Sequence, residues 1–391
     1  MKPTILMAAC FAMEKPDAEL IHFSSIANGL ARQGYAVSIF HLSLAGAPAI
    51  RSLLRPGIQF IERSINARPG NDMFIKGTLT APIFLAHIFR HKPDVLYLRL
   101  GIVSALYTIA TRLFFGNRVK IFTEHNGWIG PEARASGKPE AIAFIGQVLQ
   151  QWSARCSHSI RAVSLGIKSY LVSLGIHEEK IVVIGNGTDI NHFRPLDTTP
   201  RYDVGFTGNL APWQGLEWLV DAFAKVIDHY PEASLAIAGS GPAEQNLRHR
   251  ITAQGILNRV NLLGPIAYEH IPDIINQCRI CVAPKIQFTD TKSPHVTYSY
   301  SPLKIRDYAA SGKPIIASRI AGLEEIETGQ FGILVTPGDI QDLANAMIHL
   351  LGNPALQHSM GNNARTYAES HYAWEAVAKQ ISLQIETLMG R

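Results

Sequence analysis

The sequence predicts an α/β protein made of two doubly wound, Rossmann-like domains that face each other across a cleft. Short apolar runs alternate with segments of helical periodicity along almost the whole chain, which is typical of repeated βαβ units around a parallel sheet. The pattern stops at a polar, proline-containing stretch at 194–200 and then starts again. The length of 391 residues also suits two domains.

The first half of the chain supplies the elements of one domain. A helix from Asp17 to Gln33 places apolar side chains on one face and ends at Gly34, a residue that tolerates the left-handed conformation of a helix terminus. The expected strands are Thr4–Ala8, Ala36–His41, Asp94–Arg99, Val119–Thr123, Ser159–Val163 and Lys180–Ile184. We therefore expect an N-terminal domain over residues 1–197.

The second half repeats the pattern from Val204. A helix follows Gly215, and further helices are expected at Ile340–Leu351 and Trp374–Leu388. The expected strands are Ala233–Ala238, Val260–Leu263, Ile280–Ala283, Ile315–Ser318 and Ile333–Val335. These elements predict a C-terminal domain over residues 198–371 and a final segment, 372–391, whose helix crosses back to the first domain.

Composition excludes several other classes of protein. With 47% hydrophobic and 17% charged residues, the chain is neither disordered nor fibrous. The four cysteines lack the density of a disulfide framework, so we expect a cytoplasmic protein, with Cys278 and Cys281 packed in the core. The apolar opening runs into charged residues without a cleavage site and is interpreted as a strand, and no stretch is long enough to span a membrane.

Charge is distributed unevenly along the chain. Residues 1–200 contain 21 Lys and Arg against 13 Asp and Glu, whereas the remainder contains 15 against 18. Residues 51–120 alone have 11 basic and 3 acidic side chains, together with the largely apolar run from Ile102 to Arg112 and the pair Phe114-Phe115. This stretch suits peripheral contact with the inner face of an anionic membrane and a lipid-linked acceptor. The alternatives are a solvated charged face and core packing.

The clearest chemical signal is a short helix expected between Ser301 and Gly312. Ser301 is a natural N-cap and Pro302 a natural first helical residue. Lys304 falls in the first turn, where a cation opposes the helix dipole, so a bound phosphate would compensate it. Asp307 lies near the same face and can accept hydrogen bonds from a ribose diol. The pattern predicts a nucleoside diphosphate site, with an exposed salt bridge as the alternative.

This segment and its continuation through Ser318 resemble the donor-binding helix and following strand of the family 4 retaining glycosyltransferases, which have the GT-B fold. NGTD at 186–189 resembles the hinge entry of that family, and GFTGNLAPWQG at 205–215 resembles the first loop of its nucleotide domain. The later run FGILV at 331–335 also matches. The match is specific over 180–352 and loose over 1–179. The segments SPLK at 301–304 and APWQG at 211–215 are similar to segments of particular subfamilies.

The resemblance implies a set of donor-binding residues. The two glutamates of the family fall at Ser299 and Asp307, and its phosphate-binding Arg and Lys fall at Asn209 and Gln214, so Lys304 would have to supply the positive charge. The expected donor contacts are Gly208, Asn209, Gln214, Gly239, Gly241, Ser299, Ser301, Pro302, Leu303, Lys304 and Asp307. The donor would be a UDP-sugar or a GDP-sugar.

The N-terminal half has fewer candidates. The family places a loop facing the donor sugar where Glu124, His125 and Asn126 follow the strand expected to end at Thr123. His125 is the candidate for that contact and, with Lys304, for a catalytic role, although a lone histidine is more often an ordinary polar residue. Arg99, Glu124 and Asn126 are candidates for the acceptor side.

The resemblance also implies a mechanism. The acceptor hydroxyl would attack the anomeric carbon on the face from which the leaving group departs, and the leaving diphosphate would take the proton. Backbone N–H groups and Lys304 would replace a metal, because no paired carboxylates of the DxD kind accompany Asp203 or Asp290. The acceptor could be a glycan, a lipid-linked sugar or a small molecule, and no nucleic acid is expected.

Two other functions remain open at this point. An inactive nucleotide-sugar-binding protein would explain Ser299, Asn209 and Gln214 as losses, and a nucleotide-sugar epimerase on the same architecture would need no acceptor. The fold alone does not separate them.

Overall fold

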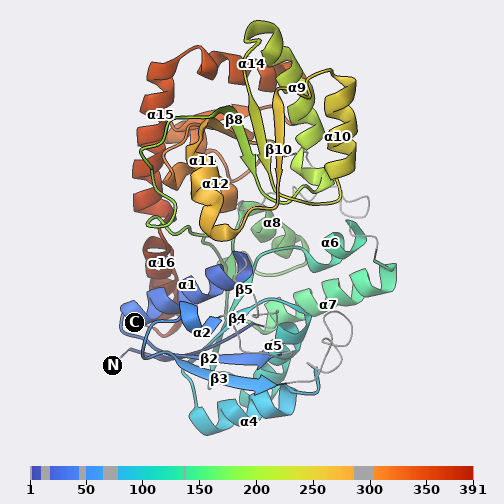
Figure 1. Ribbon diagram of the computed structural model, residues 1–391. Helices are drawn as coiled ribbons and strands as arrows, with labels where there is room; N and C mark the ends of the chain where they lie inside the picture. Colours follow the sequence, from blue (N-terminus) through green and yellow to red (C-terminus); the bar gives the residue numbers. More distant parts are fainter. Residues whose placement is uncertain are drawn as a thin grey trace. The chain divides into compact units, whose positions relative to one another are not determined.

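The computed structural model describes residues 2–9, 18–43, 50–64, 78–135, 138–285 and 303–390 (Figure 1). The chain forms two compact units, each with its own parallel sheet. Unit 1 contains the described residues up to Asn186 together with those from Trp374 onward, and unit 2 contains those between Gly187 and Ala373. The predicted fold class, two doubly wound α/β sheets, is confirmed.

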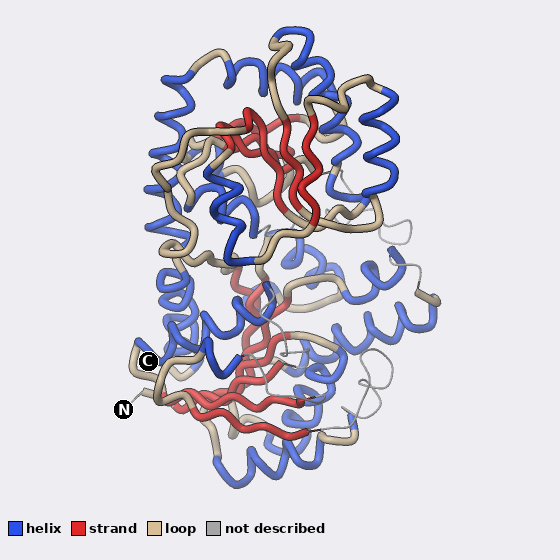
Figure 2. Tube along the Cα trace, viewed as in Figure 1, coloured by secondary structure: helices blue, strands red, loops and turns tan. Residues whose placement is uncertain are grey.

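The sheet of unit 1 has seven parallel strands in the order β3-β2-β1-β4-β5-β6-β7 (Figure 2). Their bounds are β1 Thr4–Ala9, β2 Ala36–Ser43, β3 Gln59–Ser64, β4 Val95–Arg99, β5 Lys120–His125, β6 Ser159–Ala162 and β7 Ile181–Val183. The helices are α1 Ala18–Arg32, α2 Ile50–Leu53, α4 Ala81–His91, α5 Ile102–Phe115, α6 Ile129–Ala135, α7 Glu140–Cys156, α8 Leu165–Ser173 and α16 Trp374–Leu388.

Helices cover both faces of this sheet. On one face α16 packs against α1, and Phe23 of α1 shares a buried cluster with Trp374 and Ile381 of α16. On the other face α4 and α5 pack together, and the rings of Phe84 and Tyr107 stack with centroids 4.2 Å apart. The last helix of the chain therefore completes the core of unit 1.

The sheet of unit 2 has six parallel strands in the order β10-β9-β8-β11-β12-β13. Their bounds are β8 Tyr202–Thr207, β9 Leu235–Ala238, β10 Val260–Gly264, β11 Cys278–Ala283, β12 Ile315–Ser318 and β13 Gly332–Val335. The helices are α9 Leu216–His229, α10 Glu244–Ala253, α11 Ile271–Asn276, α12 Leu303–Ala310, α13 Glu325–Thr328, α14 Ile340–Leu351 and α15 Pro354–Tyr367.

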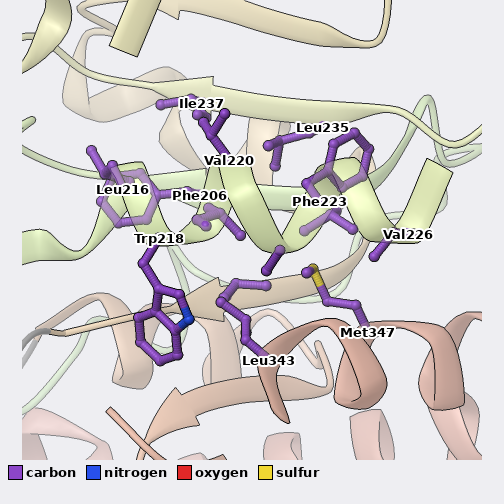
Figure 3. Close-up of a cluster of buried hydrophobic side chains, with 14 of the residues drawn as sticks. Phe206, Leu216, Trp218, Val220, Phe223, Val226, Leu235, Ile237, Leu343 and Met347 are labelled. Carbon is purple, nitrogen blue, oxygen red and sulfur yellow. The ribbon is translucent and has the colours of Figure 1, made fainter. Parts of the chain in front are cut away.

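The core of unit 2 lies on both faces of its sheet. Figure 3 shows one side, where Phe223 and Val226 of α9 lie beside Leu235 of β9 and where α14 contributes Leu343 and Met347. On the other side α12, β11 and β12 share a second buried cluster that contains Cys278 and Cys281. The Sγ of Cys278 donates to the carbonyl oxygen of Ile274 at 3.2 Å. Core packing of both cysteines, as predicted, is confirmed.

Two features of unit 1 differ from the prediction. Strand β3 was not predicted, because an edge strand such as QFIERS at 59–64 mixes polar and apolar residues and gives no continuous apolar run. Strand β5 does not end at Thr123 but continues through Glu124 and His125, which pair with Arg161 and Ala162 of β6. The prediction that these two residues lie on a loop was wrong.

Candidate functional site

Two loops at the carboxyl edge of the unit 2 sheet are joined by backbone hydrogen bonds. Gly208 N–H, after β8, donates to the carbonyl oxygen of Ala238 at 2.9 Å, and Leu210 N–H donates to Ser240 at 3.0 Å. Gly239 has a φ of 142°, and a Cβ there would lie 1.8 Å from the carbonyl oxygen of Gly208. Only glycine permits this approach, so the residue positions the two loops.

Lys304 extends from the first turn of α12 to the loop after β8. Its Nζ donates to Oε1 of Gln214 at 3.1 Å and lies 3.7 Å from the ring centroid of Phe206. A Cβ on Gly208 would lie 3.0 Å from the same Nζ. The structure thus brings together Lys304, Gln214 and Gly208, which the sequence analysis had placed in one site.

A second cation, Lys285, lies in the same place and was missed by the sequence analysis. Gln214, Lys285 and Lys304 line one small pocket with Ala283, Ile305, Ile320 and Leu323. The backbone of Lys285 is fixed by Ser318, whose Oγ accepts from Lys285 N–H at 2.7 Å and donates to its carbonyl oxygen at 2.8 Å. Its position two residues after β11, at the edge where Lys304 lies, is the signal that could have identified it.

The electrostatics of this pocket favour an anion. Burial lowers the pKa of Lys304 well below its ordinary value, and the positive charge of Lys285 acts in the same direction. A bound phosphate would stabilise the charged form of both amines. The arrangement therefore gathers the charge that a phosphate requires, although the pocket of about 10 Å³ must widen before a phosphate can enter between the two lysines and Gln214.

Asp307 lies one turn further along α12 and is half-buried. Its Oδ1 accepts a hydrogen bond from Oγ1 of Thr188 at 2.6 Å, and burial raises its pKa to about 7 although that hydrogen bond opposes the shift. Thr188 is itself held by its N–H, which donates to the carbonyl oxygen of Tyr372 at 2.7 Å. The hydrogen bond from Thr188 therefore fixes the position of the Asp307 carboxyl group, and its raised pKa leaves the group partly protonated near pH 7.

Some of the remaining predicted donor residues lie in the part of the chain that the structure describes, and the others lie outside it. Asn209 lies against the second loop, because a Cβ on Gly241 would be 2.5 Å from its Oδ1. Leu303 is the first residue of α12. Ser299, Ser301 and Pro302 lie outside the described residues.

In unit 1, His125 is fully buried at the end of β5. Its Nε2 is 3.3 Å from Oγ1 of Thr123, and its Nδ1 is 3.4 Å from Nε2 of Gln150. Burial lowers its pKa to about 3, so the imidazole is neutral at physiological pH. The sequence analysis missed this burial because Gln150 is distant in the chain.

Glu124, also fully buried, is the centre of a polar network. Its carboxylate accepts from Arg161 at 2.5 Å, lies 2.8 Å from Nε2 of His22, and also accepts from Tyr97 and Asn126. Although burial acts to raise its pKa, His22 and Arg161 hold the pKa of Glu124 well below its ordinary value. This carboxylate is therefore ionised and serves as the anchor for the groups around it.

The other two acceptor-side candidates border a pocket of about 460 Å³ at the carboxyl edge of the unit 1 sheet. Arg99 ends β4, pairs with Glu124 in the neighbouring strand, and donates to Glu19 at 3.2 Å. The pocket is lined by Glu19, Arg99, Leu100, Gly101, Asn126, Gly127, Ile129 and Glu132. It has the size of a site for a small molecule or a sugar.

Searches for known relatives match both halves of the chain. A family model described as "Glycosyltransferase Family 4" matches residues 21–192, and one described as "Glycosyl transferases group 1" matches residues 201–353. The chain is 28% identical over 188 residues to alpha-D-kanosaminyltransferase of Streptomyces kanamyceticus, covering 48% of this chain and 45% of that protein.

A second curated relative acts on a lipid according to its name. The GDP-mannose-dependent monoacylated alpha-(1-6)-phosphatidylinositol monomannoside mannosyltransferase of Corynebacterium glutamicum is 26% identical over 210 residues, covering 50% of this chain and 54% of that protein. The matched segment therefore spans about half the length of these curated relatives.

Solved structures share the fold across the whole chain. Sucrose-phosphate synthase from Thermosynechococcus elongatus aligns with a TM-score of 0.76 at 18% identity, covering 99% of both chains. Anabaena HepE in complex with UDP and glucose aligns with a TM-score of 0.72 at 21% identity, covering 99% of this chain and 100% of that one. At these identities the likeness establishes the fold alone.

Proposed function

We propose that this chain, which belongs to the family 4 (group 1) glycosyltransferases, moves a sugar from a nucleoside-diphosphate sugar to a hydroxyl acceptor with retention of configuration. The observation that carries the proposal is the convergence of Lys285, Lys304 and Gln214 on one pocket of unit 2. The two lysines provide the positive charge that the uncharged Asn209 and Gln214 do not. We also propose that the chain belongs to the subfamily that contains the sequence segments SPLK and APWQG.

In this proposal each donor group has a role that fits its surroundings. Lys304 and Lys285 bind the diphosphate, and the absence of a side chain at Gly208 leaves space beside the Lys304 amine, because a Cβ there would lie 3.0 Å from its Nζ. Asp307 accepts hydrogen bonds from the ribose diol. His125 contacts the donor sugar, which requires a change in its present contacts with Thr123 and Gln150.

The reaction requires no enzyme nucleophile. The acceptor oxygen forms a bond to the anomeric carbon on the face from which the diphosphate leaves, the bond between that carbon and the diphosphate oxygen breaks, and the acceptor proton passes to the departing diphosphate. Lys304 stabilises the negative charge that develops on the leaving group, which is the main catalytic task of such a site. The sugar is proposed to be a hexose carried by UDP or GDP.

The acceptor side of the proposal rests on unit 1. Arg99 and Asn126 border its pocket and are the proposed acceptor contacts, whereas Glu124 lies beneath them as their anchor. We propose a glycan or lipid-linked acceptor, and peripheral contact with the inner face of a membrane through residues 51–120. Within the described residues, no helix is both long and apolar enough to cross a bilayer.

Thermal unfolding with a panel of nucleoside diphosphates, with and without a chelator, tests the donor site. Ligand at 100 times its dissociation constant stabilises a protein by about 2.7 kcal/mol, which gives a measurable shift. We expect one base to shift the transition in the presence of chelator, and Lys304→Ala and Asp307→Ala to abolish the shift. Lys225→Ala, on the exposed side of α9, is the matched control and should keep it.

The outcomes separate the alternatives. If no nucleotide shifts the transition of the wild-type protein, the donor-site proposal fails. A shift without release of nucleotide from any UDP-sugar or GDP-sugar, tested with a mixture of glycan acceptors, would favour an inactive binding protein. Conversion of the donor into an isomerised nucleotide-sugar, without an acceptor and without net release of nucleotide, would favour an epimerase.

A further inference from the structure

Helix α4 exposes apolar side chains on the side that faces away from the sheet. Phe84 and Ile88 are buried against the sheet and α5, as expected of a helix that covers one face. On the opposite side Leu79, just before the helix, is 73% exposed, Ile83 is 45% exposed and Phe89 is 70% exposed. Burial in the core of unit 1 therefore does not explain why this outer side is apolar.

The C-terminal turn of α5, a helix that packs against α4, also exposes apolar side chains (Figure 1). Leu113 is 76% exposed and Phe114 is 74% exposed. The neighbouring Phe115 is only partly buried against the core, and the run from Ile102 to Thr111 contributes mainly buried side chains. The sequence analysis named two apolar segments within the basic stretch 51–120, the run from Ile102 to Arg112 and the pair Phe114-Phe115, and of these the last turn of α5 is the most exposed part. Helix α4 lies within the same stretch, but its exposed apolar side chains were not named there.

Three cations lie near these apolar side chains in the sequence. Arg90 and Lys92 lie one and three residues after Phe89, Arg118 lies four residues after Phe114, and all three are exposed. Within the described part of the chain, none of the three takes part in an ion pair. Asp94 is the sole acidic residue between 78 and 120, and its carboxylate accepts from Thr4 at 2.8 Å and 2.9 Å. The surface is therefore positively charged as well as apolar.

We propose that this α4–α5 face, formed by Leu79, Ile83, Phe89, Leu113 and Phe114 with Arg90, Lys92 and Arg118, docks the protein on an anionic lipid surface. Large exposed apolar side chains insert among lipid headgroups, and neighbouring cations are attracted to their phosphates. A protein partner that bound this surface would need acidic groups at matching positions, whereas an anionic membrane presents negative charge over its whole surface. The inference depends on the proposed function only for the identity of the acceptor, which the membrane would present.

Sedimentation of the full chain with large unilamellar vesicles tests the proposal. Vesicles of phosphatidylglycerol and phosphatidylcholine in equal parts are compared with vesicles of phosphatidylcholine alone. We expect binding to the anionic vesicles that weakens with salt. Arg90→Glu/Arg118→Glu should bind at least about tenfold more weakly, since each basic residue near such a surface contributes about fivefold. Phe89→Ser/Phe114→Ser should also lose most of the binding.

The control pair is Leu257→Ser/Leu383→Ser, because Leu257 is 67% exposed and Leu383 is 56% exposed outside this face. This control should bind vesicles like the wild type, and thermal unfolding of every variant should stay unchanged. Wild-type binding that is absent, or that survives both double substitutions at the α4–α5 face, overturns the proposal.

A second copy of the chain is the main competing occupant. Light scattering that shows a dimer dissociated by Phe89→Ser/Phe114→Ser, without vesicle binding, would assign the face to self-association and overturn the proposal. The nucleotide shift described above is measured on the same samples. Vesicle binding without a nucleotide shift would contradict the proposed donor site alone. A nucleotide shift without vesicle binding would contradict the docking surface and the membrane contact proposed for residues 51–120, and would leave the donor site standing.

Discussion

Replacing Arg161 by methionine tests how strongly the buried network supports unit 1. Arg161 is fully buried, and its guanidinium donates to Glu124 at 2.5 Å and to the carbonyl oxygens of Ile184 and Gly185 at 3.0 Å and 2.6 Å. The substitution leaves an ionised carboxylate inside the protein without its main cation. Removing one partner of a buried pair costs about 3–5 kcal/mol. We expect Arg161→Met to lower the free energy of unfolding of unit 1 by about this amount.

Urea unfolding followed by hydrogen-exchange mass spectrometry measures this loss, because peptides from the two units report separately. The matched control is Arg259→Met, which removes an exposed pair with Glu232 in unit 2 and should change stability little, since water screens such pairs. The double variant Arg161→Met/Glu124→Met should recover part of the loss, because it removes both charges of the pair and leaves no unpaired carboxylate in the core.

Three results would refute this reasoning. The first is a loss for Arg161→Met no larger than that for Arg259→Met, and the second is a double variant no more stable than the single one. The third concerns pH. Without Arg161, burial raises the pKa of Glu124, so protonation should remove the uncompensated charge and reduce the deficit as the pH falls. If the loss in free energy of unfolding caused by Arg161→Met does not change with pH, Glu124 is not ionised in the way the reasoning requires.

Three further predictions concern the donor pocket and the buried histidines. Lys285→Met should weaken nucleoside diphosphate binding by calorimetry by about 1.5–3 kcal/mol, roughly 10-fold or more, whereas Lys225→Met should leave it unchanged. Because burial raises the pKa of Asp307 to about 7, nucleotide affinity should increase from about pH 6 to about pH 8 as the carboxylate ionises, and Asp307→Asn should flatten that profile. Burial lowers the pKa of His22 to about 4 and that of His125 to about 3, so the unfolded chain binds more protons below pH 6.5. The free energy of unfolding should therefore be fully retained above pH 6.5 and should decrease toward pH 4, and equal urea midpoints across this range would contradict the neutral histidines.

The α/β fold class could be predicted because it depends on periodicity. Strands buried on both faces, such as β12 at Ile315–Ser318, appear as continuous apolar runs, and α14 at Ile340–Leu351 shows a clear helical pattern, so both matched their expected bounds. The edge strand β3 has fewer buried neighbours, and its mixed sequence carries no such signal. The expectation that Lys304 and Asp307 lie near the same face of one helix followed from their local helical spacing alone.

Contacts between distant parts of the chain were decided by the tertiary structure. Glu124 and His125 look like loop residues because polar side chains usually end a strand, and they are buried because Arg161 and Gln150 supply partners from elsewhere. The outer side of α4 illustrates the converse, since an apolar helix in the sequence looks the same whether it is buried or exposed.

The sequence by itself determined the class of this protein: two doubly wound domains, a helix carrying Lys304 and Asp307, and the resemblance to the family 4 glycosyltransferases. The tertiary structure alone decided that Lys285 joins Lys304, because sheet order makes β11 the neighbour of both β8 and β12. The physical reason is that periodicity and helical spacing are local properties of the chain, whereas burial and the meeting of charges depend on which strands become neighbours.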